Sequence, residues 1–265
     1  MKKFAMLMAA AMLAGICGTS AQIRLGGRTL DTRRLVKAGA DIAKAVTLTD
    51  ADIAKMCRES IEYMDANNQV ADSTSEYALR LDRLTKDIKD VNGMPLNFKV
   101  YLVKDINAFA SGDGSVRVFS ALMDLMDDDE LVAVIGHEIG HVAHTDVKDA
   151  MKNTYLSSAA RNAAGAAGGT LAKLTDSQLG ELAQALTGAR FSQKQETQAD
   201  EYGVDFCVKY GYDPYGMANS LKKLAGLSEG QQASAVQKMF SSHPDSEKRA
   251  AHAKALADAA VANRK

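Results

Sequence analysis

Hydrophobic residues recur at helical spacing through much of the chain. In "TDADIAKMCRESIEYMDANN" apolar or small residues return every three or four positions, which predicts an amphipathic helix. Thr49 and Asp52 stand three apart at its start and fit a capping box. The next segment, "STSEYALRLDRLTKDI", has the same spacing and a similar pair, Ser73 and Glu76. Two consecutive helices are therefore expected here.

The second half of the chain shows the same spacing. Residues 161–170, "RNAAGAAGGT", are mostly small and fit either a mobile loop or a loosely packed helix. A long helical pattern then runs from Arg190 to Tyr210 and stops at Gly211, a residue typical of helix C-caps. The last pattern, "SHPDSEKRAAHAKALADAAV", predicts a closing helix with Pro244 in its first turn.

The period changes from helical to alternating in the middle of the chain. In "LNFKVYLV" (96–103) every second residue is apolar, which predicts a half-buried strand. "SGDGS" (111–115) predicts a turn, and "VRVF" (116–119) predicts the returning strand of a hairpin. No repeat or linker divides residues 22–265. The pattern therefore predicts one domain with a mainly α fold and a small β-sheet, of the α+β class.

Composition supports this fold class and excludes one class of partner. About a quarter of the 265 residues are charged, none is tryptophan and only three are proline, which together with the many alanines favours helix. The net charge is −1, and no run of like charge is long enough to indicate a nucleic-acid partner.

The first 21 residues have the pattern of a secretory signal peptide. "MKK" is a basic start, and "FAMLMAAAMLAGI" is an apolar run too short to span a membrane. "TSA" before Gln22 offers small residues for cleavage after Ala21. A lipoprotein signal at Cys17 is the alternative, although Ile16 stands where a small residue is expected. We expect an exported protein, periplasmic or in the cell envelope.

After such cleavage, the remaining chain has no apolar run that could span a membrane, so membrane association would require a lipid on Cys17. Two cysteines would remain, Cys57 and Cys207. An exported protein permits a disulfide between them. Because one pair without a spacing motif gives no sign of a disulfide framework, two buried free thiols are favoured. Residues 22–48 match no pattern from which a role could be assigned.

The segment "VIGHEIGHVAH" has the composition of a metal site on a helix. His137 and His141 are four apart and would share one helix face, where both can bind one zinc ion. Glu138 is rotated by about 100° from His137, where a carboxylate can take a proton from zinc-bound water. The alternative is a buried amphipathic helix with two hydrogen-bonded histidines, which leaves Glu138 in a very apolar helix without a reason.

Residues around this motif fit an active helix. The acidic residues before it suit a helix N-terminus. Gly136 and Gly140 lower helix propensity, which indicates that another backbone approaches closely. His144 follows His141 by three residues and is not expected to bind the metal; it is assigned to the surface or to support of the site.

A third protein ligand has to come from elsewhere in the chain. "QETQADEYG" places Glu196 and Asp200 four apart on one helix face. This pair fits either a solvated acidic face or a functional pair. In the functional interpretation, Glu196 binds the zinc and Asp200 accepts a hydrogen bond from a ligand histidine.

The order of the motifs "HEIGH", "ETQAD" and "SHPDSEKR" resembles the zinc metallopeptidases related to the HtpX-like heat-shock proteases and the CAAX prenyl proteases. The segment "INAFASGDGSVRVF", which leads toward the active helix, is similar as well, and the resemblance covers roughly residues 50–250. It is closest to soluble exported members. It implies a gluzincin-type fold, with the active helix packed on a β-hairpin and its edge strand, and with Glu196 as the third zinc ligand.

The resemblance also implies roles for residues outside these helices. Asn107 and Ala108 would lie where the edge strand meets the substrate backbone. His243 would stabilise the transition state, and Arg249 matches the arginine that follows it in the family. From the residues alone, His243 also fits an N-terminal helix cap before Pro244.

Together these features predict a zinc-dependent endopeptidase with Glu138 as general base and His243 as donor to the oxyanion. Its substrates would be polypeptides, namely unfolded or misfolded exported proteins. Strand pairing with the hairpin of residues 96–119 would fix the peptide backbone and give broad sequence preference. The alternative is a zinc-binding scaffold or chaperone-like quality-control protein with little proteolysis, against which the presence of Glu138 argues.

Overall fold

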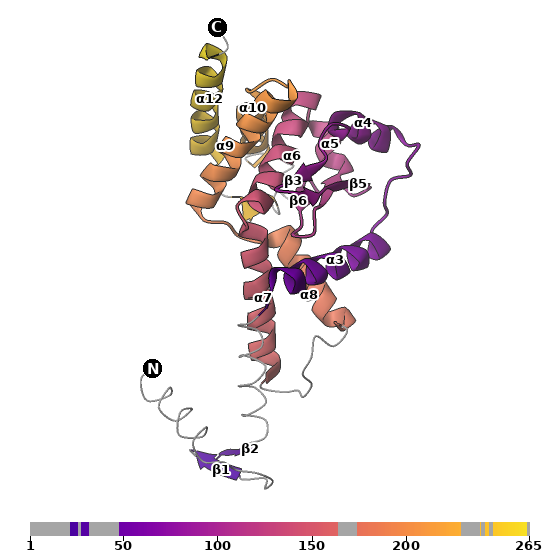
Figure 1. Ribbon diagram of the computed structural model, residues 1–265, viewed down its shortest axis with the longest axis vertical. Coiled ribbons are helices and arrows are strands. Elements are labelled where there is room, and N and C mark those ends of the chain that lie inside the picture. Colours follow the sequence, from indigo (N-terminus) through magenta and orange to yellow (C-terminus); the bar gives the residue numbers. More distant parts are fainter. Residues whose placement is uncertain are drawn as a thin grey trace.

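The computed structural model describes residues 22–25, 28–31, 48–163, 174–228, 239, 242–243 and 246–263. The expected signal peptide, with Cys17, lies outside them. Within these residues the protein is mainly helical with small β-sheets, which confirms the predicted fold class (Figure 1). None of the described helices is long and apolar enough to cross a membrane.

The elements are named here in chain order. The strands are β1 (Gln22–Leu25), β2 (Arg28–Asp31), β3 (Asp90–Val91), β4 (Met94–Pro95), β5 (Asn97–Tyr101), β6 (Ala108–Ala110) and β7 (Ser115–Phe119). The helices are α3 (Asp50–Asn67), α4 (Glu76–Thr85), α5 (Ser120–Leu125), α6 (Asp128–Ala143), α7 (Asp146–Ala163), α8 (Asp176–Gly188), α9 (Gln193–Tyr210), α10 (Gly216–Ser228) and α12 (Ser246–Ala262).

Two helix ends form as the sequence predicts. Thr49 and Asp52 make the capping box of α3, each accepting a hydrogen bond from the backbone N–H of the other. α9 ends at Gly211, which adopts the left-handed conformation with φ 80°. Its start lies three residues later than expected, because Ser192 caps the helix with its side chain.

The predicted cap of α4 was wrong by two residues. Ser75, not Ser73, is the N-cap, and its hydroxyl accepts a hydrogen bond from the backbone N–H of Ala78. Asp72 accepts hydrogen bonds from the amide and the hydroxyl of Thr74. This turn at Asp72 holds the preceding residues outside the helix and delays its start.

Two predicted segments are described only in part. α7 continues to Ala163, so the beginning of the small-residue segment is helical, while residues 164–170 lie outside the described part. The closing helix, α12, begins at Ser246, and Pro244 also lies outside the described residues.

The strand pairing differs from the predicted hairpin. The sheet has the order β5-β7-β6, in which β5 pairs with β7 in parallel and β6 pairs with β7 antiparallel. The turn at 111–115 therefore joins β6 to β7, and the strand of residues 96–103 lies across the sheet from β6. β7 is buried along its whole length because it has a neighbour on both sides. The edge strand nearest the active helix is β6.

α6 lies at the centre of the molecule. It packs against β6 and β7 of the sheet and against α9 and α10, and α12 covers α10 and α9 (Figure 1). α3, α7 and α8 pack against one another, and α8 also contacts β6. Both the predicted active helix and the edge strand are thereby enclosed by other elements.

α6 and α9 cross at close range where both helices carry glycines. The close approach predicted from Gly136 and Gly140 is confirmed. A Cβ at Gly136 would lie 2.8 Å from the Cβ of Phe206, and one at Gly140 would lie 2.9 Å from the Cβ of Tyr202. Gly203 on α9 faces the backbone of α6 in the same way. This close crossing sets how near α9 side chains come to the histidines of α6.

The two cysteines in the described part are free and buried, as expected. Burial raises the pKa of the Cys57 thiol to about 11 and that of Cys207 to about 12. Both are therefore protonated thiols at neutral pH, with the character of small apolar core residues.

Candidate metal centre

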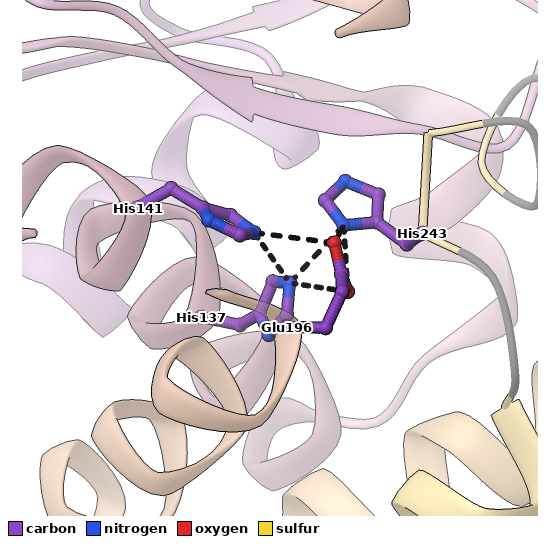
Figure 2. A group of neighbouring side chains, drawn as sticks. All are labelled: His137, His141, Glu196 and His243. Atoms are coloured by element: carbon purple, nitrogen blue, oxygen red, sulfur yellow. Dashed lines mark hydrogen bonds and ion pairs between the residues drawn. The ribbon is translucent and has the colours of Figure 1, made fainter. Parts of the chain in front are cut away.

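Four buried side chains converge at one point of the structure (Figure 2). His137 and His141 come from α6, Glu196 comes from the first turn of α9, and His243 comes from the segment before α12. Their candidate ligand atoms all lie within 4.8 Å of one another. The group unites residues that are up to 106 positions apart in sequence.

The two α6 histidines face each other and the carboxylate with the same ring atom. The Nε2 atoms of His137 and His141 are 3.2 Å apart. The nearest oxygen of Glu196 is 3.7 Å from Nε2 of His137 and 3.6 Å from Nε2 of His141. The four-residue spacing in "HEIGH" thus places both histidines on one face of α6. Glu196 approaches the two rings from α9, so the three donors lie together.

A carboxylate lies behind each of these two rings. Nδ1 of His137 is 2.9 Å from Asp200, and Nδ1 of His141 is 2.9 Å from Asp146. The contact of His141 with Asp146 is a hydrogen bond, and because an ionised carboxylate only accepts, it forms when Nδ1 carries the proton. The contact of His137 with Asp200 is equally short but lacks hydrogen-bond geometry. With a proton on Nδ1, each ring presents the lone pair of Nε2 to the centre of the group.

This donor set fits a metal ion. Two imidazole lone pairs and a carboxylate that converge in a buried space repel one another unless a cation lies among them. Burial holds the pKa of His141 well below its ordinary value, which keeps that ring neutral and able to bind a metal. Imidazole and carboxylate are also the ligands that transition metals take in catalytic sites.

Arg249 of α12 holds both acidic residues of α9. Its Nε and Nη2 each donate to Asp200 at 2.7 Å, and its Nη1 lies 2.6 Å from Glu196. Burial alone would raise the pKa of Glu196, but His243, His137 and Arg249 hold it at about 2. Burial opposes ionisation of Asp200 as well, yet Arg249 and His137 keep its pKa below the ordinary range. Both acids are thus charged at neutral pH.

Glu138 lies next to the group, and its Oε1 atom makes no hydrogen bond with the described residues. Glu138 is buried. Burial raises its pKa. Oε1 lies 3.6 Å from Nε2 of His243, a contact at ion-pair distance that is too long for a hydrogen bond. A buried carboxylate oxygen without a hydrogen bond, beside a candidate metal site, is able to accept a proton.

His243 lies closer to the other donors than the sequence indicated. Its Nδ1 is 2.9 Å from Glu196 and 3.3 Å from Nε2 of His137. Burial alone would lower its pKa, but the charges of Glu138 and Glu196 raise it. The ring therefore stands between the candidate ligands and Glu138.

The two residues expected at the substrate strand lie at the start of β6. Ala108 is the first residue of this strand, and it lines a cavity of about 10 Å³ together with Glu138 and His243. Asn107 is buried, and neither polar atom of its side chain has a partner in the described part of the chain. Its backbone carbonyl accepts a hydrogen bond from Phe119.

Two contributors to the site were not anticipated. Phe191, just before α9, stacks on the ring of His141 with 3.8 Å between ring centroids. Asp146 is the first residue of α7 and contacts His141 from behind. In the sequence, Asp146 is an acidic residue five positions after His141. Because five positions is not a helical spacing, nothing in the sequence connected the two residues. His144 caps the C-terminus of α6 and is not part of the group.

Comparison with known proteins agrees with this geometry. A family model described as peptidase family M48 matches residues 76–257. Metalloprotease LoiP of Escherichia coli (strain K12) is 42% identical over 233 residues, which cover 88% of this chain and 91% of LoiP. Metalloprotease YcaL of the same strain is 40% identical over 224 residues, covering 84% of this chain and 87% of YcaL.

A third relative is longer. The beta-barrel assembly-enhancing protease of Escherichia coli (strain K12) is 32% identical over 177 residues, which cover 63% of this chain and 36% of that protein. The matched family region contains all the residues that converge at the candidate metal centre. The resemblance to the HtpX-like metallopeptidases is thereby confirmed. The chain belongs to peptidase family M48 and is a metalloprotease.

Proposed function

We propose that the protein is a zinc-dependent endopeptidase that hydrolyses peptide bonds of unfolded or misfolded exported proteins. The observation that carries this proposal is the convergence of His137, His141 and Glu196 next to Glu138, whose Oε1 makes no hydrogen bond with the described residues. The three converging residues would hold one zinc ion. When bound, zinc supplies a Lewis acid for the scissile carbonyl and lowers the pKa of water.

Glu138 is the proposed general base. Its Oε1 is buried and engaged by no hydrogen bond in the described structure, so it can accept a proton from the attacking water. The same carboxyl group can then give that proton to the leaving amine. Its place one residue after His137 keeps it beside the ligand set without being part of it.

His243 is the proposed donor to the oxyanion of the tetrahedral intermediate. Its Nδ1 contacts Glu196, and its Nε2 lies on the side of Glu138, at 3.6 Å. A donor held by a carboxylate at one ring nitrogen has its other nitrogen fixed in direction. Asp200 and Arg249 act behind the ligands, by fixing His137 and Glu196.

The substrate backbone is expected to pair with β6, at the edge of the sheet that faces α6. Pairing with backbone atoms gives broad sequence preference. In the described structure α8 contacts this strand, and the cavities beside Glu138 measure only about 10 and 20 Å³. Each has room for about one water molecule. Peptide binding therefore requires a wider opening beside Glu138 than these two cavities provide.

Export supports the choice of substrate class. We propose a signal peptide cleaved after Ala21, so that the mature protein begins at Gln22 in the periplasm or cell envelope. The name of one relative, beta-barrel assembly-enhancing protease, ties that protein to β-barrel assembly and suits a role in quality control. Mass spectrometry of the mature N-terminus tests this, since a lipid-modified Cys17 as first residue would contradict it.

Replacement of Glu138 tests the catalytic proposal. The parent should bind one zinc per chain and cleave an unfolded reporter polypeptide. Glu138→Gln should keep the zinc and the fold but cleave about 10²- to 10⁴-fold more slowly. Glu62→Gln, at an exposed position on α3, is the matched control and should behave like the parent. Cleavage by Glu138→Gln within tenfold of the parent would reject the assigned role. A parent that binds zinc and prevents aggregation without cleavage would support the scaffold alternative.

A further inference from the structure

Asp146 has both carboxylate oxygens engaged by side chains of other helices. Oδ2 lies 2.9 Å from Nδ1 of His141 on α6, and Oδ1 accepts a hydrogen bond of 2.7 Å from Gln195 on α9. The residue is only 6% exposed. A buried carboxylate with both oxygens fixed in this way has little freedom to rotate, so it defines the direction of the ring that it contacts.

The backbone before Asp146 is strained. Thr145, between α6 and α7, has φ 67°, a left-handed conformation that β-branched residues rarely adopt. Such a conformation is unfavourable and persists where the surrounding structure requires it. Thr145 separates α6 from α7, and the first residue of α7 lies behind His141. The strained residue thus stands directly before the carboxylate that contacts the ring.

This arrangement parallels the one behind the other histidine. Asp200 contacts Nδ1 of His137 at 2.9 Å and is held by two hydrogen bonds from Arg249. Asp146 contacts Nδ1 of His141 at the same distance and is held by Gln195. Each histidine therefore has one carboxylate behind it, and each carboxylate has its own donor from a different helix.

We infer that Asp146 is a positioning residue for metal binding: held by Gln195 and the turn at Thr145, it fixes the tautomer and direction of His141. This inference rests on the proposed function in that His141 is taken as a zinc ligand. With Nδ1 protonated toward Asp146, Nε2 keeps its lone pair toward the zinc. Without Asp146, the ring is free to place its proton on Nε2, where it blocks ligation.

Interaction with the dipole of α7 does not explain the contacts of Asp146 with His141 and Gln195. Acidic residues in a first turn interact favourably with the helix dipole, and α7 has two of them, Asp146 and Asp149. Asp149 is exposed, while Asp146 is buried with its oxygens turned to α6 and α9. Asp149 therefore provides a matched control, because its removal deletes the same charge from the same helix turn.

The test measures zinc affinity by chelator competition in the full-length protein and its variants. Asp146→Ala should bind zinc about 10- to 100-fold more weakly than the parent. Asp149→Ala should match the parent. Asp146→Asn keeps one acceptor oxygen but replaces the other with a donor, so it retains only one of the two contacts and should bind zinc with an affinity between those of the parent and Asp146→Ala. Thermal unfolding of the metal-free proteins shows whether each variant is folded.

A second measurement separates positioning from mere structural support. ¹⁵N NMR of the metal-free protein should show His141 with its proton on Nδ1 in the parent and in Asp149→Ala, and a tautomer mixture in Asp146→Ala. Equal zinc affinity of Asp146→Ala and Asp149→Ala, or an unchanged tautomer, overturns the inference. If the parent binds no zinc, the proposed function fails instead, and the tautomer measurement still decides whether Asp146 orients the ring.

Discussion

At the scale of single residues, the length of the side chain separates the two acids of α9. Glu196 and Asp200 lie one helical turn apart on the same face, yet they reach different atoms. The longer Glu196 extends to the Nε2 side of both α6 histidines, at 3.6 and 3.7 Å. The shorter Asp200 stops at Nδ1 of His137, at 2.9 Å. This difference fits the proposed roles, in which Glu196 binds the metal and Asp200 supports a ligand.

Replacing these acids one at a time tests the assignment. Glu196→Ala should abolish stoichiometric zinc binding, because only the two α6 histidines of the proposed ligand set remain. Asp200→Ala should weaken binding by about 10- to 100-fold, the usual cost of losing a residue that orients a ligand. Dialysis against a graded series of zinc chelators measures both. Full zinc in Glu196→Ala with loss in Asp200→Ala would show that the roles are reversed.

How far the residues of the site could be predicted depended on sequence separation. His137, Glu138 and His141 are placed by local helical geometry, and so is the Glu196–Asp200 pair. The approach of His243 to Glu196 was not visible, because it depends on how the segment before α12 packs against α9. Asp146 was not predicted, because a strained turn and not a helical repeat places it behind His141.

At the scale of elements, the distance between α6 and α9 decides whether the ligands meet. Ala199 on α9, between Glu196 and Asp200, lies so close to Gly140 that an added Cβ would be 3.2 Å from its Cα. Any side chain at this point of α6 must push α9 outward. Since Glu196 and Asp200 flank the crossing point, both would move away from the histidines.

Gly140→Ala should therefore impair both stability and metal binding. Overpacking at a closely packed position costs about 1–3 kcal/mol, and we expect a loss of unfolding free energy in this range together with weaker zinc binding. Urea unfolding and chelator competition measure the two effects. Gly226→Ala on α10 is the control, because nothing lies within 4 Å of its added Cβ. That variant should gain up to about 1 kcal/mol from helix propensity. An equal effect of both substitutions would argue against the close crossing.

The strands show where local pattern stopped being informative. The alternation in residues 96–103 predicted β5, and its predicted partner, the strand of residues 116–119, is confirmed as β7. The predicted direction was wrong, because β5 and β7 pair in parallel and the glycine-containing turn joins β7 to β6. A parallel pair needs a crossover, and here the crossover contains β6, which is only three residues long. The alternation also gave no sign that β7 would bury Arg117, which is 2% exposed. That burial depends on Asp65 of α3, which lies 52 positions earlier.

The contact of Asp65 with the sheet gives a pH-dependent prediction. Burial alone would raise the pKa of Asp65, but hydrogen bonds from Arg117, Lys99 and Tyr101 hold it at about 2. Because the folded pKa lies below the unfolded value, the carboxylate stabilises the protein above about pH 4, and this contribution is lost as the pH falls toward 2.

Asp65→Asn should accordingly lower the free energy of unfolding at pH 7, because it leaves the buried Arg117 without its charged partner. The loss should be smaller than the roughly 3–5 kcal/mol typical of fully buried pairs, because Asp65 is partly exposed. The difference from the parent should narrow as the pH falls below about 4. Urea unfolding across this pH range measures it, with the exposed Asp82→Asn as control. A difference that stays constant with pH would contradict the assigned charge interaction.

At the scale of the whole molecule, the metal centre joins elements from most of the described chain. α6 supplies two of the candidate donors, and α9 supplies the third (Figure 2). α7 supplies the carboxylate behind His141, and α12 supplies the arginine that holds Glu196 and Asp200. α6 packs against α7 and α9, and α9 packs against α12. Charged and polar groups at the site connect all four helices. Assembly of the site and docking of α12 are thus coupled.

Zinc should therefore stabilise the entire fold. A ligand that binds only the folded state at 100 times its Kd adds about 2.7 kcal/mol. For a chain of this size that corresponds to an increase in Tm of roughly 5–10 °C. Differential scanning calorimetry of the metal-free protein, with and without zinc, measures the shift, and Glu196→Ala should show none. Because the site connects α6, α7, α9 and α12, the transition should move as one. If zinc binds but shifts only a minor part of the transition, the site and the fold are not coupled as the contacts of Arg249 require.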